Sequence, residues 1–185
     1  DLPFFAPSLH ITLVDPHRAG HELMYHPGES NLMMAHAVLI PKEDTSSVDQ
    51  ITLVKENVKR INPRAVIIDA KSPVVVTESE LIKGKNVLVI EDGPTVTHGE
   101  MSFGAGYLAA REYGAGKVVD PRPYAVGSLK DVFYRYHHLK DVLPAMGYGE
   151  KQVRELEQTI QNTPCDLVIA GTPMDLSRLL KVEVP

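Results

Sequence analysis

The stretch Lys85–Gly106, KNVLVIEDGPTVTHGEMSFGAG, decides the fold class. Its apolar run Val87–Ile90 predicts a buried strand, and the turn residues Glu91-Asp92-Gly93-Pro94 end that strand. Thr97 and Glu100 have the spacing of a capping box with Thr97 as N-cap, which predicts the start of a helix. Strand, acidic turn and capped helix therefore form the unit from which we expect the chain to be built.

The same alternation continues on both sides of this stretch. Apolar runs predict strands at 9–14, 37–40, 65–68, 87–90, 117–119 and 167–170, with a short extra strand at 74–76. Helices are expected at 48–61 after a Ser46 or Ser47 cap, and at 97–113, 128–136, 150–161 and 175–180. Residues 16–30, rich in His, Gly and charge, are expected to form a loop. We therefore expect a single α/β domain, 1–185, with a mostly parallel sheet and flanking helices.

Composition narrows the class of protein. The 185 residues carry a formal net charge of −5, so neither nucleic acid nor an anionic membrane is an expected partner. The sequence has no long uncharged apolar run, so we expect no membrane span. Cys165 is the single cysteine, which excludes an internal disulfide and indicates a reducing, cytoplasmic setting. Because the sequence begins with Asp1 rather than Met, we expect a fragment or a processed product.

Acidic residues follow most of the predicted strands. They are Asp15, Glu43 with Asp44, Asp69, Glu91 with Asp92, and Asp120, while the last strand leads into Gly171 and Thr172. Because the carboxyl ends of parallel strands meet at one edge of a sheet, we expect a binding rim there. Mg²⁺ or nearby bases would relieve the repulsion between the carboxylates. The alternative is that each acid only forms a turn or caps a helix.

Two further patterns limit the chemistry. His17, His21 and His26 could form a metal cluster, but Pro16 and Gly20 argue against the helix that would align them, so a phosphate-contacting or lid loop is expected. The sequence contains no Gly-x4-Gly-Lys-Ser/Thr, so it carries no P-loop of its own. A nucleotide site built from this chain alone would lack its main anion anchor.

Several long segments spread over nearly the whole chain are specific enough to compare with known families. They are DLPFF at 1–5, VDPHRAGHE at 14–22, EDGPTVTHG at 91–99, VDPRPYAVG at 119–127, LPAMGYG at 143–149 and GTPMDL at 171–176. Together they resemble the predicted GTPase family related to cyclic 2,3-diphosphoglycerate synthetase. Members of that family resemble P-loop NTPases. The resemblance therefore implies a three-layer architecture and makes this chain the part that follows the P-loop.

The resemblance also implies an activity and a set of site residues. The activity would be nucleotide-dependent phosphoryl transfer to 2,3-diphosphoglycerate or water, with Mg²⁺ and ATP or GTP as cofactors and a small phosphorylated substrate as partner. A homo-oligomer is compatible with this activity. The expected Mg²⁺ ligands are Asp15, Glu91 and Asp92; the expected phosphate-holding residues are His17, Arg18, His98 and Arg122; Thr95, Thr97, Gly171 and Thr172 complete the nucleotide site.

By the same resemblance, Lys42 and Asp44 lie where the family tends to have an Asn-Lys-x-Asp guanine-reading motif, with Pro41 in place of the Asn. A carboxylate could still pair with the edge of a base, but the Asn contribution is absent, which leaves ATP and GTP both open. The alternative to an enzyme part is a non-enzymatic nucleotide- or phosphate-binding regulatory domain.

Overall fold

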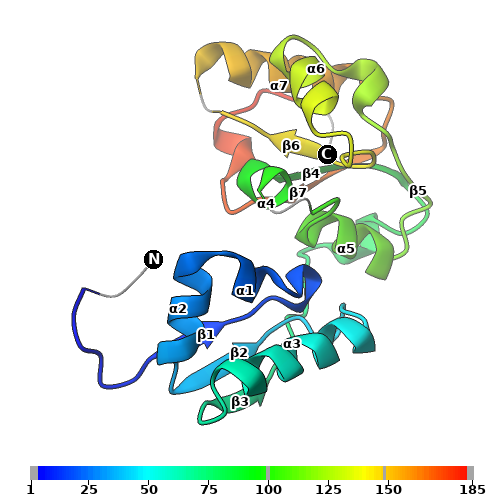
Figure 1. The fold of residues 1–185 in the computed structure, drawn as a ribbon. Helices are drawn as coiled ribbons and strands as arrows, with labels where there is room; N and C mark the ends of the chain where they lie inside the picture. Colours follow the sequence, from blue (N-terminus) through cyan, green and yellow to red (C-terminus); the bar gives the residue numbers. More distant parts are fainter. Residues whose placement is uncertain (1–3, 99–100, 148, 183–185) are drawn as a thin grey trace. The chain divides into compact units, whose positions relative to one another are not determined.

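The structure is a computed structural model that describes residues 4–98, 101–147 and 149–182 (Figure 1). The chain divides into two compact units, Asp1–Pro73 and Val74–Pro185. Each unit contains a parallel sheet flanked by helices, which confirms the predicted α/β class. The strands are shared between two sheets, of three and four strands, so the acidic strand ends do not form one edge of one sheet. The assignment of the whole chain to one domain stays a prediction.

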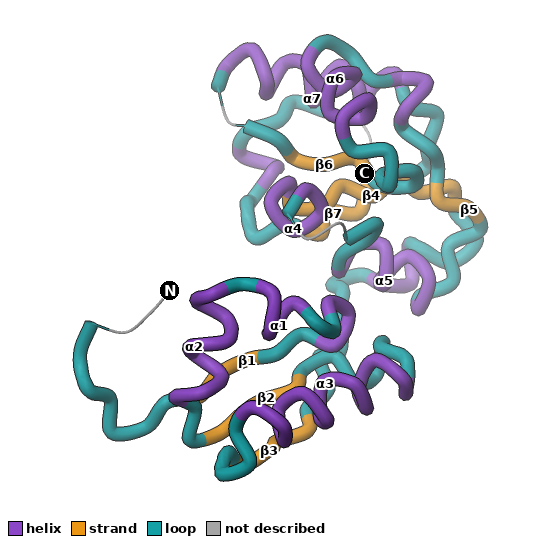
Figure 2. Tube along the Cα trace, viewed as in Figure 1, coloured by secondary structure: helices purple, strands orange, loops and turns teal. Residues whose placement is uncertain are grey.

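In the first unit, the strands lie side by side in the order in which they occur in the sequence. Its elements are β1 (Ile11–Leu13), η1 (Pro16–Arg18), α1 (His21–Met24), α2 (His26–Met34), β2 (Ala37–Ile40), α3 (Val48–Ile61) and β3 (Val66–Asp69). All strand pairs are parallel, in the order β1-β2-β3 (Figure 2). Helix α3 begins at a Ser47 capping box completed by Gln50, which confirms the predicted cap.

The expected loop at 16–30 is wrong, because helical turns occupy most of it. Pro16 and Pro27 stand in the first turns of η1 and α2, where the missing N–H costs nothing and the fixed φ favours a helix. The break between η1 and α1 comes from Gly20, whose φ of 100° an L-residue rarely adopts. Proline and glycine thus set helix boundaries here instead of excluding helices.

The core of the first unit lies on one face of its sheet. Val38 and Ile40 of β2 are fully buried against Leu32 of α2 and Val54 and Val58 of α3. Successive strand residues point to opposite faces, so this core contains only alternate residues of β2. The first unit therefore consists of two layers.

The second unit is organised around β4. Its elements are η2 (Ser79–Leu81), β4 (Asn86–Asp92), α4 (Gly93–Thr97), α5 (Ala105–Glu112), β5 (Lys117–Val118), η3 (Arg122–Tyr124), α6 (Ser128–Arg135), β6 (Leu143–Ala145), α7 (Glu150–Asn162), β7 (Leu167–Gly171) and η4 (Leu176–Arg178). Strand β7 pairs with β4 along one edge, and β5 and β6 pair with the two ends of its other edge, all in parallel. This brings the carboxyl ends of β4, β6 and β7 together.

Helices cover both faces of this second sheet. Val87, Leu88, Val89 and Ile90 are each at most 1% exposed. They share a core with residues of α5 on one side and of α6 and α7 on the other (Figure 1). This unit therefore has the three layers that the resemblance implied. Within the part of the chain that the structure describes, no helix is long and apolar enough to cross a membrane.

Three details of the second unit differ from the sequence analysis. The capping box at Thr97 is wrong: α4 begins at Gly93 with Asp92 as N-cap, and Thr97 is its last residue. Pro94 in the first turn favours this early start, while Glu100 lies outside the described residues. Residues 74–76 form no strand. Strand β6 was not predicted, because Pro144 reads as a turn residue within so short an apolar run.

Candidate functional site

An ion pair joins two of the predicted site residues at the carboxyl edge of the first sheet. Asp15 follows β1, and its Oδ2 lies 2.6 Å from Nζ of Lys42, which follows β2. The other carboxylate oxygen of Asp15 accepts the backbone N–H of His17 at 3.1 Å. The structure therefore brings Asp15, His17 and Lys42 together, as the parallel topology predicted.

Lys42 has a backbone conformation that points to a specialised loop. Its φ of 61° is left-handed, a region that side chains other than Gly, Asn and Asp seldom occupy. Its carbonyl accepts the backbone N–H groups of Thr45 and Ser46, both at 3.1 Å, which holds the turn. Strain of this kind is often found at binding sites, where the surrounding structure stabilises it.

His17 and Asp44 complete this edge. His17 Nε2 lies 2.9 Å from the hydroxyl oxygen of Thr45, and Asp44 Oδ1 accepts the backbone N–H of Ser72 at 3.1 Å. Burial lowers the pKa of His17, although the charge of Asp15 acts in the opposite direction. A neutral imidazole at pH 7 can donate through one nitrogen and accept through the other. Arg18, the next residue after His17, is the last residue of η1.

The remaining acids of the first edge are neutralised by a base that the sequence analysis did not include. Lys55 of α3 lies 3.1 Å from Glu43 and 2.8 Å from Asp69. No local pattern indicated this pairing, because Lys55 reaches both acids from helix α3. For Glu43 and Asp69, a nearby base therefore supplies the counter-charge, which is one of the two means of relief that the sequence analysis named.

Glu91 is a fully buried carboxylate at the carboxyl end of β4. Its Oε1 accepts the backbone N–H groups of Gly104 at 3.0 Å and Tyr107 at 2.8 Å, at the start of α5. Its Oε2 has no hydrogen-bond partner among the described residues. Burial raises the pKa of Glu91, although these backbone hydrogen bonds act against the rise.

Glycines make the space for this carboxylate. A Cβ at Gly104 would lie 2.4 Å from Glu91 Oε2, and a Cβ at Gly171 would lie 2.6 Å from it. Gly171 is the residue of β7 that pairs with Glu91. The seat of Glu91, meaning the space that Gly104 and Gly171 leave for its carboxylate, therefore lies at the ends of two neighbouring strands. Glu91 therefore links β4, β7 and the first turn of α5.

The other predicted residues of this edge have local partners. Asp92 accepts the backbone N–H and the hydroxyl of Thr95 as N-cap of α4. Thr97 donates its hydroxyl to the carbonyl of Gly93, and His98 is the C-cap of α4. The expectation that Thr97 and His98 lie at the positive end of a helix is therefore wrong, since both lie at its C-terminal end.

Arg122 forms a two-pronged ion pair with Asp120. Its Nε lies 2.9 Å from Oδ1, and a terminal nitrogen lies 2.6 Å from Oδ2. The pairing lowers the pKa of Asp120 and raises the pKa of Arg122. The predicted phosphate-binding charge of Arg122 is thus balanced locally.

The predicted Mg²⁺ ligands follow strands of both sheets. Asp15 belongs to the first sheet, while Glu91 and Asp92 end β4 of the second. Among residues 4–98, 101–147 and 149–182, no group of three His, Cys, Asp or Glu side chains is placed to hold a metal ion. Mg²⁺ in nucleotide enzymes needs only one or two carboxylates besides the phosphates, so the predicted Mg²⁺ site stays a prediction.

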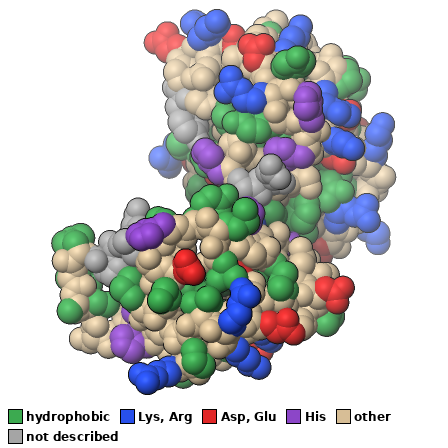
Figure 3. All heavy atoms as spheres, viewed as in Figure 1, with side chains coloured by type: hydrophobic (Ala, Val, Ile, Leu, Met, Phe, Trp, Pro, Cys, Tyr) green, Lys and Arg blue, Asp and Glu red, His purple; other side chains and the backbone are tan. Residues whose placement is uncertain are grey.

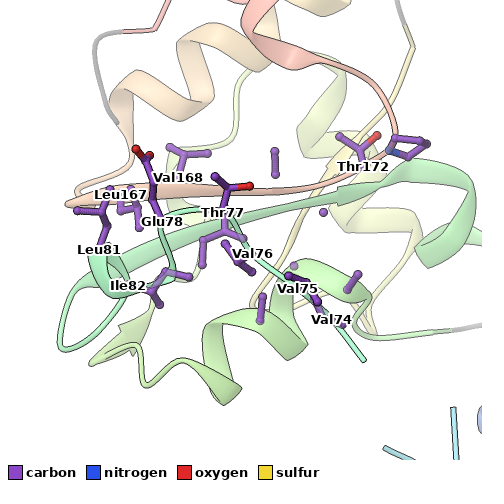
Figure 4. Close-up of a pocket in the computed structure, with 17 residues that line it drawn as sticks. Val74, Val75, Val76, Thr77, Glu78, Leu81, Ile82, Leu167, Val168 and Thr172 are labelled. Atoms are coloured by element: carbon purple, nitrogen blue, oxygen red, sulfur yellow. The ribbon is translucent and has the colours of Figure 1, made fainter. Parts of the chain in front are cut away.

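A cavity of about 780 Å³ lies beside β7 in the second unit (Figure 4). Its walls are residues 74–78, the first half of α5, and residues 167–173, which include Gly171 and Thr172. The walls are mostly aliphatic, with Thr77, Glu78 and Thr172 as polar groups (Figure 4). Its volume is in the range of small-molecule sites. The sequence analysis missed it, because 74–76 was assigned to a strand.

Comparison with known proteins links the chain to an enzyme. No family model matches the sequence. The chain is 54% identical over all 185 residues to a protein of Thermococcus kodakarensis named arginine synthetase ArcE. It spans 41% of the length of that relative. The chain is therefore homologous to part of an enzyme.

Proposed function

We propose that this chain is part of a nucleotide-dependent enzyme that forms arginine. The observation that carries the proposal is that the chain is 54% identical, over all 185 residues, to a protein named arginine synthetase ArcE. Because the chain spans 41% of that relative, the activity belongs to the whole protein and the chain contributes some of its residues. The resemblance to P-loop NTPases supports ATP or GTP with Mg²⁺ as the source of energy.

The carboxyl edge of the first sheet is the part that we assign to the nucleotide. Asp15 would act as a Mg²⁺ ligand, and the bound ion would neutralise phosphate charge. Lys42 pairs with Asp15 at 2.6 Å. When Mg²⁺ binds Asp15, the Lys42 ammonium group would form an ion pair with a phosphate oxygen instead. His17, Arg18 and Asp44 surround this pair and would orient the nucleotide.

The carboxyl edge of the second sheet is the part that we assign to the small substrate. The cavity beside β7 has the size for it, and Thr172 is one of the residues that line it with a hydroxyl group. Glu91 holds the start of α5, which forms one wall of the cavity. Its role is therefore to position that wall.

A segment exchange tests the proposal. The 185 residues of the T. kodakarensis relative that match this chain are replaced by this chain, and arginine is measured under the conditions that support the relative's own activity. The exchanged enzyme should form arginine only when Mg²⁺ and ATP or GTP are present. The relative without the segment is the background control.

A folded exchanged enzyme that binds nucleotide but forms no arginine would contradict the proposal. It would instead favour the regulatory alternative, in which this chain binds a nucleotide or phosphate without taking part in the reaction. Thermal melting of the exchanged enzyme separates this result from a failure to fold.

A further inference from the structure

One face of the sheet in the first unit is aliphatic and open. Parallel pairing places Ile11, Ala37 and Val66 side by side, and Leu13, Leu39 and Ile68 beside one another two residues further along. These six residues form the open sheet face, in which Ala37 of the central strand is only 8% exposed and the outer strands carry the strongly exposed side chains. Of its four residues on the outer strands, Ile11 is 48% exposed, Leu13 64%, Val66 61% and Ile68 42%.

The connections of the first unit explain why this face is open. The strands lie in chain order, so right-handed crossovers place all connecting helices on the same side of the sheet. The core they form contains Val38, Ile40 and Ile67, which alternate with the residues of the open sheet face. Within the part of the chain that the structure describes, the sheet pairs no strand beyond β1 or β3, so both edges can be extended.

Parallel sheets with one face in water are rare, since their strands are normally covered on both sides. A contiguous aliphatic patch of this kind marks a contact surface. The six side chains carry no charge, which suits an apolar helix face better than a nucleic acid or a polar ligand. They are also too few to bury the about 800 Å² per partner of a stable dimer.

We propose that the open sheet face is the packing surface for a helical segment of the ArcE-like polypeptide outside the matched region. More than half of the relative's length lies outside the match, so such a segment is available there. In doubly wound sheets, the second face is covered by helices whose connections run in the opposite direction from a central strand. The inference rests on the relationship used in the proposed function, but not on arginine formation itself.

A substitution made in two settings tests this assignment. Val66→Glu places a charge on the open sheet face, and Val48→Glu places the same side chain at the exposed start of α3 as a matched control. In the isolated chain, both variants should melt within about 3 °C of the parent, because both positions face water. In the exchanged enzyme, Val66→Glu should lower the melting temperature by more than about 5 °C, while Val48→Glu should not.

Three results would overturn the assignment. The first is a folded exchanged enzyme whose melting temperature is unchanged by Val66→Glu. An equal loss in the isolated chain and in the exchanged enzyme would mean that these 185 residues already cover the face. Self-association of the isolated chain in sedimentation, abolished by Val66→Glu, would identify a second copy as the occupant. Leu13→Glu on β1 repeats the test on the other outer strand. If the exchanged enzyme fails to fold, the same substitutions are made at the matching positions of the relative, and unchanged melting there also refutes the assignment.

Discussion

The two sheets of this chain differ in how their faces are covered. In the second sheet, Val87–Ile90 of β4 is buried on both sides, and its unbroken apolar run matches that environment. In the first sheet, Ala37–Ile40 of β2 is just as apolar, and Val66–Ile68 of β3 is apolar as well, but helices cover only one side. The sequence of the first unit is therefore suited to a sheet with two covered faces. The comparison indicates that its structural context extends beyond the described residues.

The largest expected difference is between two leucines. Leu88 of β4 is fully buried, whereas Leu13 of β1 is 64% exposed. Leu88→Ala should lower the free energy of unfolding by about 2–5 kcal/mol, because it leaves a cavity in a packed core. Leu13→Ala should change it by less than about 1 kcal/mol in the isolated chain. Urea unfolding of both variants measures the two values, and equal losses would refute the comparison of the sheets.

A smaller effect is expected at the seat of Glu91. The three atoms nearest to a Cβ at Gly104 all belong to this carboxyl group. Gly104→Ala should therefore cost about 1–3 kcal/mol in the parent chain and close to nothing in a Glu91→Ala background. A double-mutant cycle gives the coupling directly. If the cost of Gly104→Ala were the same in both backgrounds, the glycine would not serve to accommodate the carboxylate.

The buried carboxyl group should also affect stability as a function of pH. Burial raises the pKa of Glu91 above its ordinary 4.5, so the folded chain binds this proton more tightly than the unfolded chain. As the pH rises above 4.5, the unfolded chain loses the proton first, and the free energy of unfolding falls until the folded-state pKa is passed. Glu91→Gln removes this contribution. Urea titrations between pH 4.5 and neutrality should show a smaller decline for Glu91→Gln than for the parent.

The smallest effect on the free energy of unfolding is expected at the carboxyl edge of the first sheet, where Asp15 forms a partly exposed ion pair with Lys42. Lys42 is left-handed at φ 61°, and its pair with Asp15 is 42% and 22% exposed on the two side chains. Lys42→Gly loses an ion pair worth about 0–1 kcal/mol but relieves a backbone cost of similar size. The free energy of unfolding should therefore change by less than about 1 kcal/mol. A loss of several kcal/mol would make Lys42 a structural residue.

Local patterns predicted much of the fold. The bounds of the strand at 37–40 and the helix at 48–61 were correct, and Ser47 is one of the two caps predicted, because an apolar run and a capping serine are local signals. The sequence at 16–30 misled, since Pro27 can start a helix as readily as end one. Thr97 had the spacing of a cap, but Asp92 and Pro94 started the helix earlier.

The site was predicted only where topology brings strand ends together. Asp15 and Lys42 follow neighbouring parallel strands, so their proximity could be expected. The space around the Glu91 carboxylate depends on Gly104 and Gly171, which come 13 and 80 residues after Glu91 in the sequence. No local pattern connects the three residues. The same holds for Lys55, which reaches two strand ends from a helix face.

The measurement that tests the account most directly is arginine formation by the exchanged enzyme with Asp15→Asn. This substitution keeps the shape of the side chain but removes the charge that would hold Mg²⁺. Asp49→Asn, at an exposed acid in the first turn of α3, is the matched control. The account predicts that Asp15→Asn reduces arginine to the background of the deleted segment with an unchanged melting temperature, while Asp49→Asn retains activity. Full arginine formation by the Asp15→Asn enzyme would contradict it.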